Sequence, residues 1–255
     1  MKKPYIKRIA KIAEFGIWSV NGYWIRKNLD PAFTNFGSRR HFAFIPKDEF
    51  WIDKENGKIE ARYFIENFLA IQRELKKGKS YPEAIETADK VERRERNRSE
   101  FLKKIKKIRV KEKILKRVYK KPLFEKYAKN LKIKLVRGNI VRSLFYLDFT
   151  EGGHDKIYNF IPENEIWIDD KVYKKERALV LIHELRERAL MSKGWPYTPT
   201  PQGVFERQNK TGKRSAHFSA ENLEYWCRNH PKSIRRILLR EIRENEKFME
   251  KSVKK

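Results

Sequence analysis

The decapeptide FIPKDEFWID at residues 44–53 recurs almost unchanged as FIPENEIWID at residues 160–169, which lie 116 positions later. The same offset holds without a gap over residues 20–81 and 136–197, where glycines, arginines and aromatic residues match. Self-similarity at a fixed offset is the sequence signature of a repeated structural unit. The sequence therefore predicts a tandem duplication in which these two segments superpose.

The second copy contains an insertion of 16 residues after Tyr197. Beyond it the copies match again at an offset of 132, as in the pair Glu92 and Glu224. The insertion lies within the segment 198–215, which holds Pro, Gly, basic residues and one Phe. A segment of this length predicts either a lid or substrate arm, or a tolerated surface loop.

Each copy predicts the same order of elements. In the second copy the β-branched stretch 133–149 indicates a hairpin that turns at Gly138, and the FIPENEIWID segment at 160–169 indicates a short strand whose entry is restricted by Pro. Helices are expected near 176–193 and 216–229, and the second of these corresponds to 82–98 in the first copy. The predicted class is α+β, with two small domains that each contain a short sheet and two helices.

Composition points to a polyanionic partner. The 255 residues include 61 Lys and Arg against 34 Asp and Glu, a formal net charge of +27, and 40% are hydrophobic, too many for a disordered chain. Nucleic acid is the first candidate partner, because each neutralised phosphate releases counterions. The alternative is the charge-rich surface of a thermophilic protein, which explains many charges better than it explains their imbalance.

The positive charge is concentrated between the copies. Residues 90–121 contain 16 Lys or Arg and 4 Asp or Glu, with apolar residues at helical spacing. This pattern predicts a basic amphipathic helix that binds nucleic acid, or else a solvated helix face. The candidate phosphate-binding residues are Lys103, Lys104, Lys106, Lys107, Arg109, Lys111, Lys113, Lys116 and Arg117.

These patterns divide the chain into four parts. The degenerate first copy is expected at 1–98, the basic linker at 99–130, the second copy at 131–230 and a basic C-terminal helix at 231–255. The lone Cys227 excludes a disulfide scaffold, and no apolar run is long enough to span a membrane. The basic N-terminus lacks the apolar core of a signal peptide, so a cytoplasmic protein is expected.

The candidate chemistry lies in the second copy only. On the predicted helix 176–193, the spacing of His183 and Glu187 places both side chains on one face, one turn apart, where both can ligate one metal ion. Glu184 is the candidate catalytic base, and His217 is the candidate third ligand. The alternative is a Glu-rich surface helix.

The first copy helps to choose between these readings. At the places of His183, Glu184, Glu187 and His217 it has, in that order, Asn67, Phe68, Ile71 and Ile85. Side chains on a solvated face would not need apolar replacements, whereas side chains around an interior cavity would. Glu224 and Asp169 persist in the first copy and are therefore expected to be structural.

The segment DFTEGGHDK, which starts at Asp148, is also specific to the second copy. Paired glycines before His154 indicate a turn that brings the backbone close to a ligand, and His154 is a candidate proton donor or extra ligand. Asp148 and Asp155 are further candidates at this site. An ordinary hairpin turn is the alternative.

The pattern FIPxNEhWID (h is apolar), then HELxERxLM, GxxY and a later AH followed by Glu, resembles a family of mostly uncharacterised small proteins. Phages, plasmids and other mobile elements encode this family. The resemblance covers 148–228, and a degenerate form of it covers 32–98. It implies a zincin-like metal-binding helix and no particular activity. The first copy departs from the pattern at every site position.

Three functions fit these observations. The first is a metal-dependent hydrolase, most simply a zinc peptidase. The second is a DNA- or RNA-binding protein, in which a metal site is either structural or nucleolytic, with Mg²⁺ or Mn²⁺ favoured by carboxylates and Zn²⁺ by imidazoles. The third is a scaffold of a mobile element without catalysis.

Overall fold

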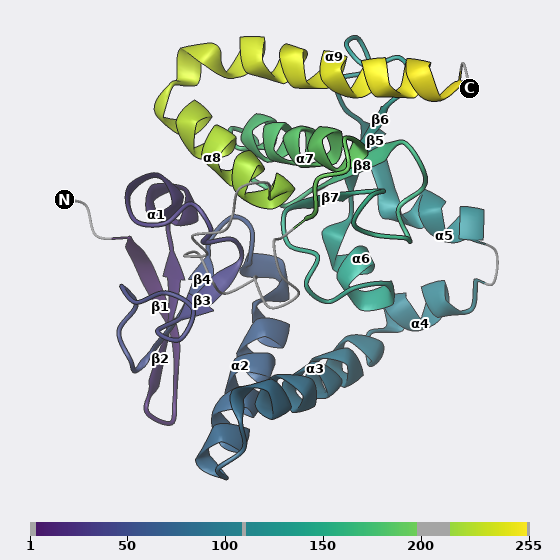
Figure 1. Ribbon diagram of the computed structural model, residues 1–255. Coiled ribbons are helices and arrows are strands. Elements are labelled where there is room, and N and C mark those ends of the chain that lie inside the picture. The colour runs from purple at the N-terminus through teal and green to yellow at the C-terminus, as the bar shows by residue number, and fades with distance from the viewer. Residues whose placement is uncertain (1–3, 109–110, 198–214, 254–255) are drawn as a thin grey trace. The chain divides into compact units, whose positions relative to one another are not determined.

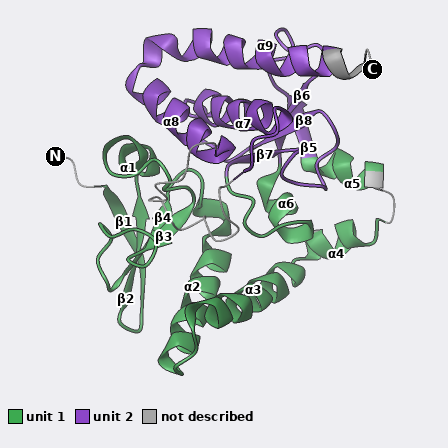
Figure 2. Ribbon diagram, in the orientation of Figure 1, with its two compact units in different colours: residues 1–118, 137–150 green, residues 119–136, 151–255 purple. Residues whose placement is uncertain are grey.

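The computed structural model describes residues 4–108, 111–197 and 215–253 (Figure 1). These residues contain α-helices and two four-stranded sheets, so the predicted α+β class is confirmed. The chain forms two compact units (Figure 2). Unit 1 comprises 1–118 and 137–150, and unit 2 comprises 119–136 and 151–255.

Unit 1 is built around a sheet with strand order β1-β2-β4-β3, in which β2 and β4 are parallel and the other pairs are antiparallel. Its strands are β1 (Tyr5–Ile12), β2 (Phe15–Val20), β3 (Phe36–Ser38) and β4 (Glu49–Asp53). Its α-helices are α1 (Gly22–Asn28), α2 (Ala61–Lys76), α3 (Tyr81–Asn97), α4 (Glu100–Lys106), α5 (Lys111–Val118) and α6 (Gly138–Leu144). A short 3₁₀ helix at Lys58–Glu60 precedes α2.

Unit 2 is built around a sheet with strand order β5-β6-β8-β7, in which β6 and β8 are parallel. Its strands are β5 (Tyr119–Pro122), β6 (Lys132–Val136), β7 (Gly152–His154) and β8 (Glu165–Asp169). Its α-helices are α7 (Arg177–Ser192), α8 (Ala216–Asn229) and α9 (Ile234–Val253), and a 3₁₀ helix at Pro231–Ser233 precedes α9.

The last five residues of the repeated decapeptide form equivalent strands, β4 and β8, in the two sheets. The parallel pairing starts at Gly16 with Glu49 in one sheet and at Lys132 with Glu165 in the other. In unit 1, Glu49 accepts hydrogen bonds from the Trp51 indole at 2.6 Å and from a tyrosine hydroxyl of β1 at 2.7 Å. Glu165 accepts bonds from the same residue types of its own sheet at 2.9 and 2.7 Å. The glutamate of the motif thus links strands of its sheet.

A buried arginine between two glutamates also occurs once in each unit. The two triads are Glu60–Arg96–Glu92 and Glu176–Arg228–Glu224. Corresponding residues of the two triads lie 116 positions apart (Glu60 and Glu176) or 132 positions apart (the other two pairs). These are the offsets that relate the two sequence copies. The pair with Arg228 agrees with the expectation that Glu224 is structural.

The hairpin predicted around Gly138 is wrong. Strand β6 pairs with β5 and β8, and Gly138 begins α6 instead of turning the chain back. The corresponding glycine of unit 1, Gly22, shows why glycine is needed: a Cβ atom there would lie 1.9 Å from Asp53 Oδ2. A close approach, and not a turn, therefore explains a glycine at this place in the repeat.

The single helix predicted over the basic linker is also wrong. Helix α3 ends at Asn97, α4 and α5 are short helices, and the chain enters the sheet as β5 at Tyr119. Ser99 has extended backbone angles and forms the N-cap of α4, so the helix cannot continue through it. The C-terminal helix is confirmed as α9.

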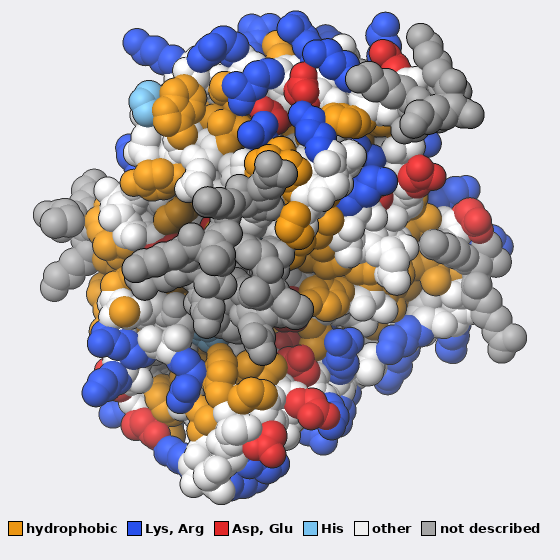
Figure 3. Space-filling model, in the orientation of Figure 1, with side chains coloured by type: hydrophobic (Ala, Val, Ile, Leu, Met, Phe, Trp, Pro, Cys, Tyr) orange, Lys and Arg blue, Asp and Glu red, His pale blue; other side chains and the backbone are white. Residues whose placement is uncertain are grey.

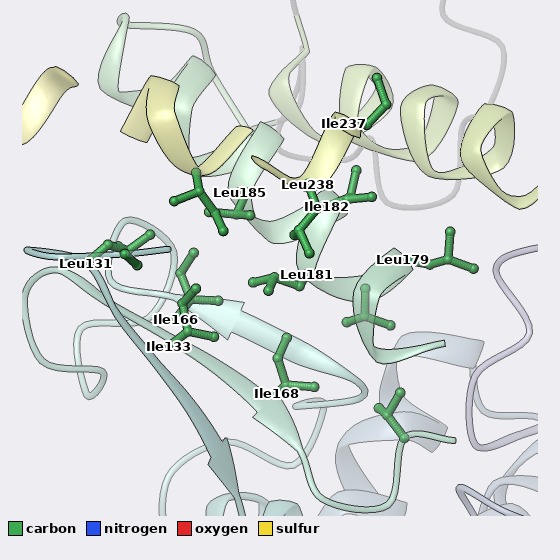
Figure 4. Packing of buried hydrophobic residues seen from close by; sticks show 14 of the residues in the cluster. Leu131, Ile133, Ile166, Ile168, Leu179, Leu181, Ile182, Leu185, Ile237 and Leu238 are labelled. Atoms are coloured by element: carbon green, nitrogen blue, oxygen red, sulfur yellow. The ribbon is translucent and has the colours of Figure 1, made fainter. Parts of the chain in front are cut away.

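Helix α7 is the centre of unit 2. Figure 4 shows Leu181 and Leu185 of α7 facing Ile166 and Ile168 of β8. On the other side of α7, α9 contributes Leu238 and two isoleucines to the same core. Because α7 is covered on both sides, its polar residues are held in fixed positions inside the unit. No helix among the described residues is long and apolar enough to span a membrane.

Candidate metal centre

Glu187 is the hub of a polar cluster on α7. It is 3% exposed, and three imidazole nitrogens surround its carboxylate. His154 Nε2 lies 3.0 Å from Oε1, while His217 Nδ1 lies 2.8 Å and His183 Nε2 3.5 Å from Oε2. The three histidines come from β7, α8 and α7, so the fold brings together residues that are far apart in the sequence.

His183 is oriented by a second carboxylate. Its Nδ1 atom lies 3.1 Å from Glu224 Oε2, and Glu224 is held in turn by Arg228 at 2.8 Å. A histidine that donates Nδ1–H to a carboxylate keeps Nε2 available, and metal-binding histidines are commonly fixed in this way. The Nε2 atom of His183 faces Glu187 Oε2 at 3.5 Å, an arrangement in which both could ligate one ion.

His154 has a different part in the cluster. Its Nδ1 atom accepts a hydrogen bond from the backbone N–H of Lys156 at 3.2 Å, so the proton of the neutral ring lies on Nε2. Nε2–H then donates to Glu187. This hydrogen bond tests neither of the two predicted roles, proton donor or extra ligand, and both stay predictions. His154 positions the Glu187 carboxylate so that its other oxygen faces His183 and His217.

The glycines before His154 form strand β7 and not a turn. A Cβ atom on Gly152 would lie 2.9 Å from Glu184 Oε1, so a larger residue would displace that carboxylate. The predicted turn is therefore wrong, and the backbone at Gly152 closely approaches the side chain of Glu184. Glu184 itself is 8% exposed, and burial together with the charge of Glu187 raises its pKa to about 8.

The pKa values of the cluster reflect its hydrogen bonds. Burial would lower the pKa of His183, but its bonds to Glu187 and Glu224 outweigh burial and raise that pKa well above the ordinary value. Burial would raise the pKa of Glu187, yet bonds from His154, His183 and His217 hold it well below the ordinary value. Without a metal ion, the carboxylate of Glu187 is therefore stabilised by protonated or donating imidazoles.

Two sets of three residues among the described ones have ligand atoms within 4.8 Å of one another. The first set is His183, Glu187 and His217, and the second is His154, Glu184 and Glu187. Two ligands of a tetrahedral zinc ion lie about 3.3 Å apart. The 3.5 Å between His183 Nε2 and Glu187 Oε2 fits this value, whereas the 2.8 Å to His217 is a hydrogen bond that an ion would replace.

Unit 1 contains no such cluster among its described residues. Asn67 donates to Asp89 at 3.3 Å, and Phe68 stacks on Phe50 with ring centroids 4.4 Å apart. Phe68 and Ile71 are 5% and 8% exposed, so apolar side chains do lie in the interior of this unit. This packing is consistent with the expectation that, in the first copy, apolar side chains fill the interior space that the site residues occupy in the second copy.

Two of the predicted site residues do not join the cluster. Asp155 binds Arg188 through both carboxylate oxygens, at 2.6 and 3.0 Å, and is part of the frame of unit 2. Asp148 belongs to unit 1, where burial raises its pKa and Tyr146 is its hydrogen-bond partner. The segment 198–215 lies outside the described residues except for Ser215, which caps α8 two residues before His217.

The residue that sequence reasoning missed is Glu224. Its persistence in the first copy as Glu92 indicated a structural role, and the Arg228 pair confirms that role. Its second oxygen nevertheless orients His183. Helical spacing offered the only signal, because Glu224 follows His217 by seven residues and so lies on the same face of α8.

No protein-family model, curated protein or solved structure gave a significant match to this chain.

Proposed function

We propose that unit 2 is a metal-dependent hydrolase, most simply a peptidase, whose ion is held by His183, Glu187 and His217. The observation that carries this proposal is the convergence of these three side chains with His183 fixed by Glu224. Two imidazoles and one carboxylate form a known ligand set of catalytic zinc, which leaves a position for water. The two imidazoles favour Zn²⁺ over Mg²⁺ or Mn²⁺.

The roles of the other residues follow from their places. When bound, the ion would polarise water and the scissile carbonyl. Glu184 is adjacent to the ligands in the sequence and buried beside Gly152, and it is the group that would take the proton from water. His154 positions Glu187, and Glu224 positions His183.

We further propose that residues 1–98 and 131–230 derive from one duplicated domain. The equivalent parallel registers and the matched arginine triads support this origin. Only one copy would then have kept the metal site.

A second candidate function is nucleic-acid binding through α4 and α5. Leu102, Ile105 and Val118 are buried and anchor this segment. The basic side chains whose exposure is described are turned to solvent: Lys103, Lys104, Lys106, Lys107, Lys113, Lys116 and Arg117. Binding to phosphates suits a protein of the mobile-element type that the sequence resembles, and it is compatible with a hydrolase in unit 2.

The metal assignment predicts about one divalent ion per chain, with zinc preferred. His183→Ala and Glu187→Ala should each lose this ion, because each removes one of three ligands from a buried site. The measurement is elemental analysis after reconstitution with zinc and dialysis. His41→Ala, which changes an exposed histidine of unit 1, should retain the ion. Stoichiometric metal in both ligand variants would refute the assignment.

The nucleic-acid assignment predicts strong dependence on salt. If α4 and α5 contact six to ten phosphates, affinity should fall by roughly a thousandfold or more between about 50 and 200 mM salt. Changing Lys103, Lys104, Lys106 and Lys107 to Glu should weaken binding to unrelated sequences equally, as measured by fluorescence anisotropy.

A control variant for that experiment has the same change in net charge at lysines outside α4 and α5. Lys47, Lys54, Lys58 and Lys90 are exposed lysines of unit 1 outside α4 and α5. Changing these four to Glu should weaken binding much less. Equal losses in the two variants would show that net charge, and not the surface of α4 and α5, determines affinity.

A further inference from the structure

The turn between α8 and α9 carries an exposed aromatic pair. The rings of Trp226 and His230 stack with centroids 4.2 Å apart and planes inclined by 13°. Trp226 is 40% exposed and the neighbouring Tyr225 is 51% exposed, although both lie on a helix whose other side is packed. Large aromatic side chains left in solvent beside a well-formed core indicate a binding surface.

The stack is held in place by its own backbone. His230 Nδ1–H donates to the Trp226 carbonyl at 2.8 Å, and the His230 backbone N–H donates to the Cys227 carbonyl at 3.0 Å. Pro231 follows directly and restricts the chain further. The imidazole is therefore a fixed flat ring with one face on Trp226, so little side-chain entropy remains to be lost on binding.

The surroundings of the stack are positive. Residues 225–240 contain no Asp or Glu. Lys232, Arg235 and Arg236 are exposed and make no ion pair with a described residue. At the upper left of Figure 3, where α8 meets α9 in Figure 1, Lys and Arg side chains lie around hydrophobic side chains. A flat aromatic platform bordered by cations is complementary to a base and its phosphates.

We propose that this aromatic stack, with Lys232, Arg235 and Arg236, binds single-stranded nucleic acid by stacking an unpaired base on the ring pair. A duplex offers its phosphates to the cations but keeps its base faces covered, so it would use only part of the surface. An acidic peptide would likewise meet only the cations. The site therefore distinguishes single strands from other polyanions.

The feature is specific to the copy that carries the metal centre. At the offset of 132, Trp226 and His230 correspond to Arg94 and Arg98 of the first copy. The stack is also separate from the metal centre, because Trp226 follows His217 by nine residues and so lies on the opposite side of α8, about 13 Å along its axis. The inference is independent of the proposed hydrolase and of the surface of α4 and α5.

The test compares Trp226→Leu with the unchanged protein, since this change removes the ring and preserves the net charge. At about 200 mM salt, affinity for a short fluorescent oligothymidine should fall by about tenfold, within the range measured for loss of one base–aromatic stack. An abasic strand of equal length and polyglutamate should bind both proteins equally. Trp226→Phe should restore most of the affinity.

Two further variants keep the result interpretable. Tyr127→Leu removes an aromatic residue of unit 2 that is 42% exposed, and it should bind oligothymidine like the unchanged protein. His230→Ala removes only the exposed imidazole ring and should show the same selective loss of oligothymidine binding. It therefore tests the proposal even if Trp226→Leu does not fold. Unchanged oligothymidine binding in either stack variant would overturn the proposal. Equal losses for the abasic strand or polyglutamate would do so as well. Metal content tests the proposed metal site separately. The variant with four Lys→Glu changes at residues 103, 104, 106 and 107 tests the proposed surface of α4 and α5 separately.

Discussion

Glu184→Gln should reduce the proposed hydrolysis by at least about a hundredfold while the protein keeps its metal ion. Glutamine has nearly the same shape as glutamate, so packing beside Gly152 is preserved, but it cannot accept a proton from water. Loss of a general base reduces the rate by roughly a hundredfold to ten-thousandfold. The measurement is turnover of a labelled casein by the zinc-loaded protein, together with elemental analysis of the same sample.

A matched variant shows whether the loss is local. Glu163→Gln changes an exposed glutamate of unit 2 in the same way, and it should remain fully active. A phosphodiester substrate should be tested in parallel. Turnover of that substrate alone would show that the protein is a nuclease and not a peptidase. Full activity in Glu184→Gln would show that Glu184 does not act as the base in the reaction. Zinc-loaded protein that turns over neither substrate would refute the hydrolase and leave a metal-binding protein.

The sequence predicted part of the candidate centre because part of it is local. The spacing of His183 and Glu187 is helical, so their common face follows from α7 alone. The position of His154 beside Glu187 depends on β7 pairing with β8 and on α7 crossing that sheet, and no local pattern contains this information. Asp148 lies six residues before His154 in the sequence, yet it belongs to the other unit.

The fold was predictable to a similar extent. The helix near 176–193 was found because the segment is rich in Ala, Leu and Arg and ends at Gly194, a C-cap residue whose φ is +83°. The hairpin at Gly138 failed because a parallel pairing of β6 with β8 joins residues 33 positions apart, while a glycine between β-branched residues suggests a local turn. The long basic helix failed because Ser99 begins a new helix and tertiary pairing recruits Tyr119 into the sheet.

Glu60→Ala should be among the most destabilising single substitutions in unit 1. Glu60 is 2% exposed and bridges Arg96 and Arg142, each of which is 1% exposed. Removing the shared carboxylate leaves two buried guanidinium groups short of an anion, and loss of one partner from a buried ion pair costs about 3–5 kcal/mol of unfolding free energy. Denaturant unfolding at neutral pH measures this difference. Glu14→Ala breaks an exposed pair with Lys76 and should leave stability unchanged.

The same substitution has a defined dependence on pH. Burial would raise the pKa of Glu60, but the charges and hydrogen bonds of Arg142 and Arg96 outweigh burial and hold that pKa below its ordinary value. The folded state therefore favours the ionised carboxylate, and its contribution is fully present above the unfolded pKa of about 4.3. That contribution is lost as the pH falls through the lower folded pKa. The stability difference between the unchanged protein and Glu60→Ala should thus be constant from about pH 5 to 8 and shrink in stronger acid. A difference that grew on acidification, or a variant as stable as the unchanged protein at neutral pH, would show that Glu60 does not hold the two arginines as an anion.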